Sequence, residues 1–227
     1  EDLKIVYMGT PDFAVEPLRR LVEDKYNVVG VVTMPDKPAG RGHKLQFSPV
    51  KQYAVDNNLH VMQPEKLKAE EFVNELRSLN ADLFIVVAFR MLPEVVWAMP
   101  RLGTFNLHGS LLPQYRGAAP LNWAVINGEK ETGITTFFLT HEIDTGKIIQ
   151  QEKIAINEED NVGTIHDKLM IMGGDLVLDT VKNIIAGTVK PKPQEELYAS
   201  ESELKPAPKI FKETCHLNFN NPTENIH

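Results

Sequence analysis

The stretch that decides the fold class is Leu83-Phe84-Ile85-Val86-Val87-Ala88, a fully apolar run that predicts a buried strand. Further strand signals lie at residues 3–8, 27–33, 61–62 and 104–107, and residues 13–22, 49–57 and 65–79 have the apolar spacing of helices. Strands that alternate with helices predict an α/β fold with a doubly wound, mostly parallel sheet. Ligands of such sheets bind at the carboxyl ends of the strands, where we expect the functional site.

The rest of the chain predicts an antiparallel edge and a long helix. Two strand signals, at residues 132–139 and 147–155, follow one another with a turn between them, and helical spacing then extends over residues 162–186. Gly173 and Gly174 fall within that helix. Because glycine weakens a helix interior, we expect a kink or break there.

The composition changes after Thr188, where four prolines at positions 191, 193, 206 and 208 lie among polar residues, as is typical of an extended linker. Beyond them a new apolar alternation begins near Leu217 and Phe219. We therefore expect one domain over residues 1–189, a linker over 190–208 and the beginning of an incomplete second domain over 209–227.

The 227 residues, 42% of them hydrophobic, are enough for one ordinary domain plus an appendage. The formal net charge of −7 disfavours a protein that grips nucleic acid over its whole surface. The lone Cys215 argues against an internal disulfide and a cysteine-based zinc site. With no signal-peptide pattern and no apolar run near the ~18 residues of a membrane span, we expect a cytoplasmic protein without membrane association.

The first turn of the predicted sheet is Gly9-Thr10-Pro11-Asp12. A dinucleotide-binding turn needs several glycines in G-x-G-x-x-G spacing so that the backbone can approach a pyrophosphate, and only Gly9 is present. The motif is better interpreted as a strand-to-helix turn at the mouth of the crevice.

A basic loop follows the second predicted strand. Residues 35–51 carry Lys37, Arg41, Lys44 and Lys51 against Asp36 alone, a local charge of +3 on an acidic chain. A glycine-flanked arginine on such a loop suits an RNA groove, where phosphates supply affinity and shape supplies register. The alternative is a solvated loop whose charges aid solubility.

Three polar residues near strand ends are the candidate catalytic set. Asn106 and His108 occupy alternate positions of one strand, so their side chains point into the same space. An amide and an imidazole can both donate hydrogen bonds to an oxyanion that forms on a carbonyl, and Asp144 can orient the imidazole and relay a proton. Such a set can move an acyl group onto an amine; for isolated residues, a structural role at the strand end is the alternative.

The surrounding residues carry a resemblance to a known family. The segments 106–113 (Asn-Leu-His-Gly-Ser-Leu-Leu-Pro), 115–120 and 143–146 together resemble the signature of the folate-dependent formyltransferases. Residues 9–14, 38–42 and 48–51 are similar to the branch of that family that formylates initiator tRNA. The similarity extends from about residue 4 to residue 219, and it implies the Rossmann-like formyltransferase fold.

The resemblance implies transfer of a formyl group from 10-formyl-tetrahydrofolate to the amino group of methionine on initiator tRNA, without a metal or covalent intermediate. By the family's pattern Asn106, His108 and Asp144 are catalytic. The residues implied to border the folate are Ser110, Leu111, Leu112, Pro113, Ala88, Phe89, Arg90, Met91, Leu92, Thr140, His141, Glu142 and Ile143. Those implied to contact tRNA are Lys37, Arg41 and Lys44, with Arg41 matching the arginine of a loop that enters the acceptor stem.

The second domain would then be a small β-barrel that holds the tRNA from its other side, and we expect the enzyme to be a monomer. Arg90 departs from the family, which usually has glycine there, and it either contacts a folate carboxylate or turns to solvent. His141 and Glu142 also differ locally and are expected to be solvated loop residues.

Other functions share part of this pattern. A glycinamide ribonucleotide or amino-sugar formyltransferase, or a formyl-folate hydrolase, would have the same Asn106, His108 and Asp144. The glycinamide ribonucleotide and amino-sugar enzymes have no use for the basic loop around Arg41 or for a second domain after the linker. The hydrolase would release formate when no amine acceptor is present. A catalytically inactive tRNA-binding module would keep the loop but has no reason to keep all three catalytic residues.

Overall fold

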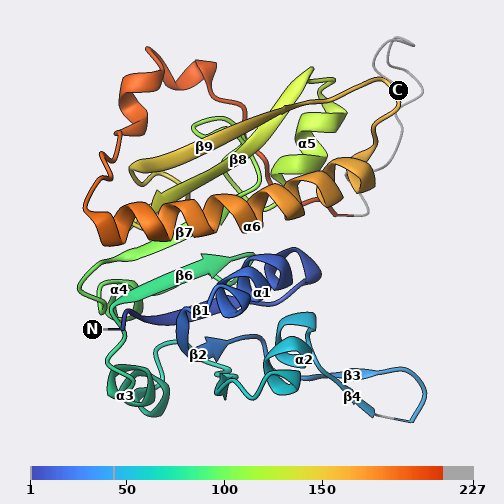
Figure 1. Ribbon diagram of the computed structural model, residues 1–227. Coiled ribbons are helices and arrows are strands. Elements are labelled where there is room, and N and C mark those ends of the chain that lie inside the picture. The colour runs from blue at the N-terminus through green and yellow to red at the C-terminus, as the bar shows by residue number, and fades with distance from the viewer. Residues whose placement is uncertain (1, 43, 212–227) are drawn as a thin grey trace.

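The computed structural model describes residues 2–42 and 44–211, and its centre is a seven-stranded sheet in the order β5-β2-β1-β6-β7-β8-β9 (Figure 1). The first five strands of that order pair in parallel: β5 (Val61–Met62), β2 (Asn27–Val32), β1 (Lys4–Gly9), β6 (Leu83–Val87) and β7 (Thr104–His108). The last two, β8 (Glu131–Phe138) and β9 (Ile148–Ala155), are antiparallel. The predicted fold class and its antiparallel edge are confirmed.

Helices cover both faces of the sheet, which is why β6 is apolar throughout. Its Leu83, Ile85 and Val87 pack with α1 (Val15–Glu23), α2 (Pro49–Asp56) and α6 (Val162–Ala186). Phe84 and Val86 point the other way and pack with α3 (Glu70–Ser78) and α4 (Glu94–Trp97). Burial on both faces removes the apolar–polar alternation of a half-exposed strand.

Helix boundaries follow local signals except where a loop contact intervenes. α2 begins at Pro49, and the Ser48 hydroxyl accepts the Lys51 backbone N–H at 3.0 Å, the cap that the sequence predicts. α3 begins five residues after the predicted Glu65, because the Glu65 carbonyl accepts from Arg90 and the chain forms a turn first.

The long helix α6 continues through Gly173 and Gly174 without interruption, so the expected kink is wrong. A Cβ atom on Gly173 would lie 2.9 Å from Leu107 Cδ2, and one on Gly174 would lie 3.0 Å from Arg20 Cγ. The glycines therefore let α6 approach the sheet and α1 closely, and the packing stabilises the helix that they weaken locally.

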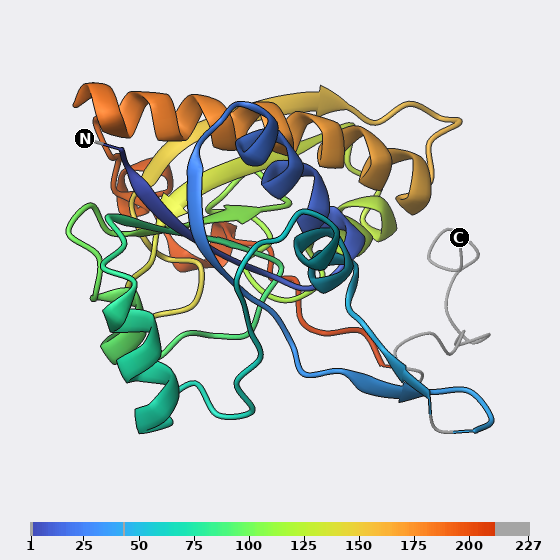
Figure 2. The same ribbon diagram turned by 60° about the horizontal axis from the view of Figure 1, so that its bottom comes forward.

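The predicted basic loop contains a hairpin, β3 (Lys37–Ala39) and β4 (Lys44–Gln46), which projects from the body (Figure 2). Other short elements did not follow from the sequence pattern: α4, α5 (Pro120–Ile126) and three short 3₁₀ helices, η1 (Asp12–Ala14), η2 (Gln194–Leu197) and η3 (Glu201–Glu203). Each is a turn or two long, so it carries little periodicity.

Residues 192–208, which we call the strap, return to the domain instead of extending away from it (orange to red in Figure 1). Lys192 exchanges two backbone hydrogen bonds with Ile148, of 2.8 and 2.9 Å, and Ala207 pairs with the Arg116 carbonyl and the Ala119 N–H. Gln194 and Ala207 are fully buried. The segment expected as a linker is therefore packed against the rest of the domain.

The expected second domain falls mainly outside the described residues, as do Cys215 and the strand signal at residues 217–219. No helix in the described ranges combines the length and apolar character needed to cross a membrane.

Candidate active site

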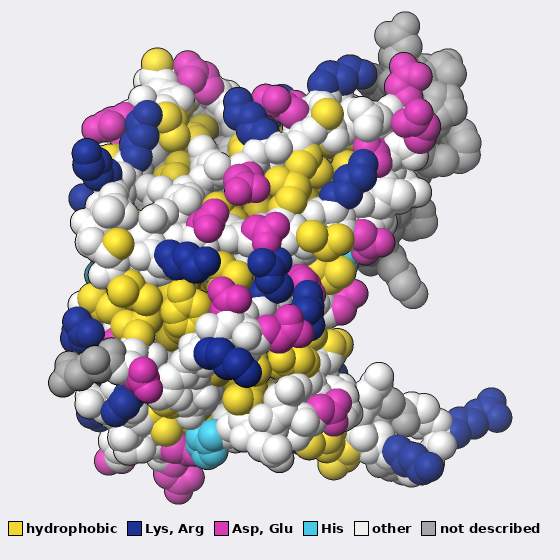
Figure 3. Space-filling model, viewed as in Figure 1, with side chains coloured by type: hydrophobic (Ala, Val, Ile, Leu, Met, Phe, Trp, Pro, Cys, Tyr) yellow, Lys and Arg dark blue, Asp and Glu magenta, His cyan; other side chains and the backbone are white. Residues whose placement is uncertain are grey.

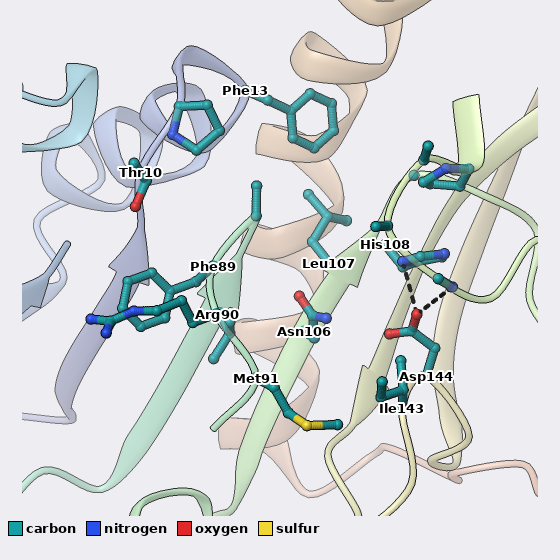
Figure 4. A pocket seen from close by; sticks show the side chains of 18 of the residues that line it. Thr10, Phe13, Phe89, Arg90, Met91, Asn106, Leu107, His108, Ile143 and Asp144 are labelled. Carbon is teal, nitrogen blue, oxygen red and sulfur yellow. Dashed lines mark hydrogen bonds and ion pairs between the residues drawn. The ribbon is translucent and has the colours of Figure 1, made fainter. Parts of the chain in front are cut away.

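A cavity of about 830 Å³ opens at the carboxyl ends of β1, β6 and β7, the position predicted for a ligand (Figure 4). Its walls come from the loops after those strands, from residues 117–122 and 139–144, and from one side of α6. All three predicted catalytic residues line it. Five further residues that the sequence pattern did not indicate also line it: Phe13, Trp97, Val162, His166 and Leu169.

Asn106 projects its amide into the cavity from β7 (Figure 4). Its Oδ1 is buried, and it finds no hydrogen-bond partner among the described residues. Leaving a buried polar group unpaired costs free energy that a folded protein rarely bears without a reason. The unpaired Oδ1 is therefore a candidate acceptor for a donor group of a ligand, and Nδ2 of the same amide can donate.

His108 lies two residues along the same strand, and both of its ring nitrogens face identifiable groups. Nε2 lies 2.8 Å from the Tyr115 carbonyl oxygen, and because a carbonyl only accepts, Nε2 carries a proton. Nδ1 lies 3.8 Å from Asp144 Oδ2, and the side chains of His108 and Asp144 are only 8% and 10% exposed. Nδ1 is thus the nitrogen that can gain or lose a proton, with a carboxylate beside it.

Asp144 is held in a demanding conformation by neighbouring segments. Its φ of +55° is uncommon for a residue other than glycine. The Gly117 N–H donates to Oδ2 at 2.8 Å, and the Gln194 side-chain amide donates to the Asp144 carbonyl at 2.8 Å. Gly117 has a φ of +123°, and a Cβ atom there would lie 2.5 Å from the Ala207 carbonyl oxygen, so only glycine fits.

The implied folate-bordering residues divide into two groups. The segments 88–92 and 140–143 line the cavity, with Phe89, Met91 and Ile143 facing it (Figure 4). His141 and Glu142 are exposed, and the His141 ring stands edge-on to Trp97.

Ser110, Leu111, Leu112 and Pro113 do not line the cavity, which differs from the expectation. Ser110 is fully buried and donates to the Gln114 carbonyl at 2.7 Å, and Leu112 packs against Phe137 and Ile148. The chain turns away from the cavity after β7 ends at His108, so these residues support the site from behind.

Arg90 does not turn to solvent. Its guanidinium donates to the carbonyls of Pro64 and Glu65 at 2.7 and 2.9 Å, and burial lowers its pKa. Its Nε is buried without a partner among the described residues. Arg90 therefore ties the cavity loop 88–92 to the loop before α3.

The basic residues of the hairpin lie apart from the cavity, at the projecting lower right of Figure 3. Lys37, Arg41 and Lys44 are exposed. Lys51, at the base, instead pairs with Asp36 at 2.7 Å, and hydrogen bonds from Lys51 and Gln63 lower the Asp36 pKa. Arg41 and Lys44 thus place exposed positive charge toward the hairpin tip, and Lys37 adds to it from the start of β3.

No group of three or more His, Cys, Asp or Glu side chains within residues 2–42 and 44–211 is arranged to hold a metal ion.

Comparison with known proteins adds a family model described as formyl transferase, which matches residues 3–181. The chain is 71% identical over its full length to the methionyl-tRNA formyltransferase of Bacteroides thetaiotaomicron and 53% identical over 226 residues to that of Flavobacterium johnsoniae. In both cases it covers 70% of the relative's length.

Solved structures share the fold at lower identity. A sugar 3N-formyl transferase, solved in the presence of dTDP and 5-N-formyl-THF, matches with a TM-score of 0.70 and 20% identity, over 100% of this chain and 77% of that one. A glycinamide ribonucleotide transformylase from Symbiobacterium toebii matches with a TM-score of 0.69 and 16% identity, over 84% and 94% respectively.

Proposed function

The chain belongs to the formyl transferase family, and on that premise we propose that it transfers the formyl group of 10-formyl-tetrahydrofolate to the amino group of methionyl initiator tRNA. The relatives that support this acceptor are methionyl-tRNA formyltransferases about 70% identical over the whole chain. The amino-sugar and glycinamide ribonucleotide enzymes are related at 20% identity or less and support the fold alone.

The observation that carries the proposal is the Asn106 side-chain amide, whose Nδ2 can donate, projecting into the cavity beside the His108–Asp144 pair. When an amine attacks a formyl carbon, negative charge develops on the formyl oxygen. A neutral amide donates to that oxygen without titrating, and fixed donors in a site shielded from water stabilise such charge strongly.

The His108–Asp144 pair accepts and returns the proton that moves during the transfer. The attacking amine must lose one proton and the departing nitrogen must gain one. Nε2 of His108 is engaged by the Tyr115 carbonyl, so the proton moves through Nδ1, where Asp144 stabilises the protonated ring. The pair thus returns to its starting state after each transfer.

The cavity walls fit a flat heterocycle with a polar edge. Phe89, Leu92, Ile143 and Trp97 supply apolar surface near Asn106, and the backbone of residues 88–92 and 140–143 offers hydrogen-bonding groups. We propose that these segments hold the folate, which supplies the activated formyl group. A cavity of about 830 Å³ admits this molecule and the aminoacyl end of a tRNA but not the tRNA body.

The hairpin is the proposed contact for that body. Lys37, Arg41 and Lys44 are exposed on an element that projects from an acidic protein, so they present local positive charge to phosphates. Residues 209–227 are the proposed start of a further tRNA-binding domain.

The deciding experiment offers 10-formyl-tetrahydrofolate with methionyl initiator tRNA, glycinamide ribonucleotide, an amino-sugar nucleotide, or no acceptor. We expect rapid formylation of the methionyl-tRNA alone. Formylation of the ribonucleotide or the sugar instead would contradict the acceptor, and formate release at the same rate without an amine would indicate a hydrolase.

A further inference from the structure

Gln194 makes four hydrogen bonds to the loops that carry Arg116 and Asp144, yet it lies on the strap, outside the residues 3–181 that the family model matches. Its side-chain amide donates to the carbonyls of Asp144 and Gly146, both at 2.8 Å. Its Oε1 accepts from Nε and Nη2 of Arg116 at 3.1 and 2.8 Å. Both amide hydrogens and the oxygen of a fully buried side chain are thereby used.

We propose that Gln194 is a positioning residue for formyl transfer, which acts through Asp144 and does not touch either substrate. This proposal rests on the proposed catalytic roles of Asp144 and His108. Gln194 does not line the cavity, so its effect must pass through the loops that it holds.

The backbone conformation of Asp144 explains why it needs such a contact. A φ of +55° is uncommon for a residue other than glycine, so the surroundings of Asp144 must hold it there. Gln194 binds the carbonyls on either side of Thr145 and so fixes the turn that presents the Asp144 carboxylate. Without those two bonds the turn can relax.

The same side chain also reaches the partners of the catalytic pair. Arg116 lies between Tyr115, whose carbonyl holds His108 Nε2, and Gly117, whose N–H holds the Asp144 carboxylate. By accepting from Arg116 and donating to residues 144 and 146, Gln194 joins the two loops that set the 3.8 Å separation of His108 and Asp144. The pairing of Ala207 with residues 116 and 119 keeps the strap against the first of these loops.

Two substitutions separate the donor role of Gln194 from its packing. Gln194→Glu has nearly the same shape and can still accept from Arg116, but a carboxylate cannot donate to the carbonyls of Asp144 and Gly146. Gln194→Leu removes the donor and acceptor roles together. We expect both variants to lower kcat roughly 10- to 100-fold, since misplacement by about 1 Å can cost about 100-fold, while 5-formyl-tetrahydrofolate binds within about twofold of the normal affinity.

Thr180→Val is the matched control for the loss of a buried hydrogen bond. The Thr180 hydroxyl is fully buried and bonds the Leu176 carbonyl and Thr136, on the part of α6 away from the cavity. We expect this variant to lower the Tm while leaving kcat unchanged well below the Tm. If Gln194→Glu and Gln194→Leu behave like Thr180→Val, the positioning role is wrong.

A double-mutant cycle with Asp144→Asn tests the route of the effect. If Gln194 acts through the Asp144 carboxylate, Gln194→Glu should reduce the residual kcat of Asp144→Asn by much less than it reduces that of the unmodified enzyme. Equal fold losses in the two backgrounds would overturn the proposal.

Hydrogen exchange at the Gly117 amide supplies a readout that needs neither catalysis nor an acceptor. This N–H is bonded to Asp144 Oδ2, so we expect Gln194→Glu to accelerate its exchange at least tenfold while amides of β1 and β6 keep their protection. Unchanged Gly117 protection would contradict the positioning role even if the enzyme proved to formylate another acceptor. Faster exchange in a protein inactive on methionyl-tRNA would instead contradict only the proposed acceptor.

Discussion

The cavity centre and the β3–β4 hairpin hold their functional side chains in opposite ways. His108 and Asp144 are about nine-tenths buried and are fixed by Tyr115, Gly117 and, through the backbone, Gln194. Arg41 instead stands exposed near the tip of a two-stranded projection. Acyl transfer needs donors that are already in place when charge develops, whereas attraction of phosphates needs accessible charge and tolerates mobility.

The largest expected effect comes from removing the oxyanion donor. Asn106→Ala should lower kcat about 100-fold or more, because loss of one such donor typically costs about 2.7–4 kcal/mol of transition-state stabilisation. Binding of 5-formyl-tetrahydrofolate, measured by calorimetry, should survive. Asn122→Ala, another amide in the cavity wall, is the control. Near-normal turnover of Asn106→Ala would remove Asn106 from the catalytic role.

The second effect tests whether the catalytic pair depends on the close packing of Gly117 against the strap. Gly117→Ala introduces a Cβ atom 2.5 Å from the Ala207 carbonyl oxygen at a φ of +123°. We expect the free energy of unfolding to fall by about 1–3 kcal/mol and kcat to fall as well. Gly128→Ala also has a positive φ, of +66°, but meets open space, so it should cost less and leave kcat unchanged. Equal effects of the two substitutions would show that the strap contact is unimportant.

The third effect should appear in tRNA affinity and not in chemistry. Replacing Lys37, Arg41 and Lys44 together by alanine should raise the KM for methionyl-tRNA roughly tenfold and flatten its dependence on salt, with kcat at saturation unchanged. Lys153→Ala, an exposed lysine on β9, is the control for a lost surface charge. A salt dependence identical to that of the unmodified enzyme would contradict the hairpin as the phosphate contact.

The smallest expected effect is on the pH dependence of the stability that the contact between Glu129 and the strap contributes. Hydrogen bonds from Lys205 and Tyr115 lower the pKa of Glu129 and tie the strap to the body. A carboxyl group with a lowered folded pKa contributes stability that is fully present above its unfolded pKa, about 4.3, and is lost as pH falls through the folded value.

The difference in unfolding free energy between the unmodified protein and Glu129→Gln should therefore be constant near neutral pH and shrink below about pH 4.3. Denaturant unfolding at several pH values measures it, with Glu131→Gln, an exposed glutamate on β8, as the control. A difference that grows as the pH falls would have the wrong sign.

Local sequence pattern was sufficient to predict the main sheet and the shared orientation of Asn106 and His108. The apolar run of β6 predicts burial on both faces, Ser48 and Pro49 predict the start of α2, and a period of two places Asn106 and His108 on one side of β7. Each of these follows from residues a few positions apart. The role of Asp144 followed from its chemistry only as a hypothesis, which the resemblance to a family strengthened, because nothing in its neighbours alone joins it to His108.

The tertiary structure decided what distant residues do to one another. The bond between Gly117 and Asp144 spans 27 positions, that between Gln194 and Asp144 spans 50, and that between Arg116 and Gln194 spans 78. The proline-rich composition of the strap predicted an extended linker, and Gly173 and Gly174 predicted a broken helix. Both expectations failed because composition does not reveal which distant part of the chain packs against a segment. The amino-acid sequence by itself therefore determined the strands of the main sheet, the longer helices and the reactive groups, while close packing between distant segments decided how those groups are held.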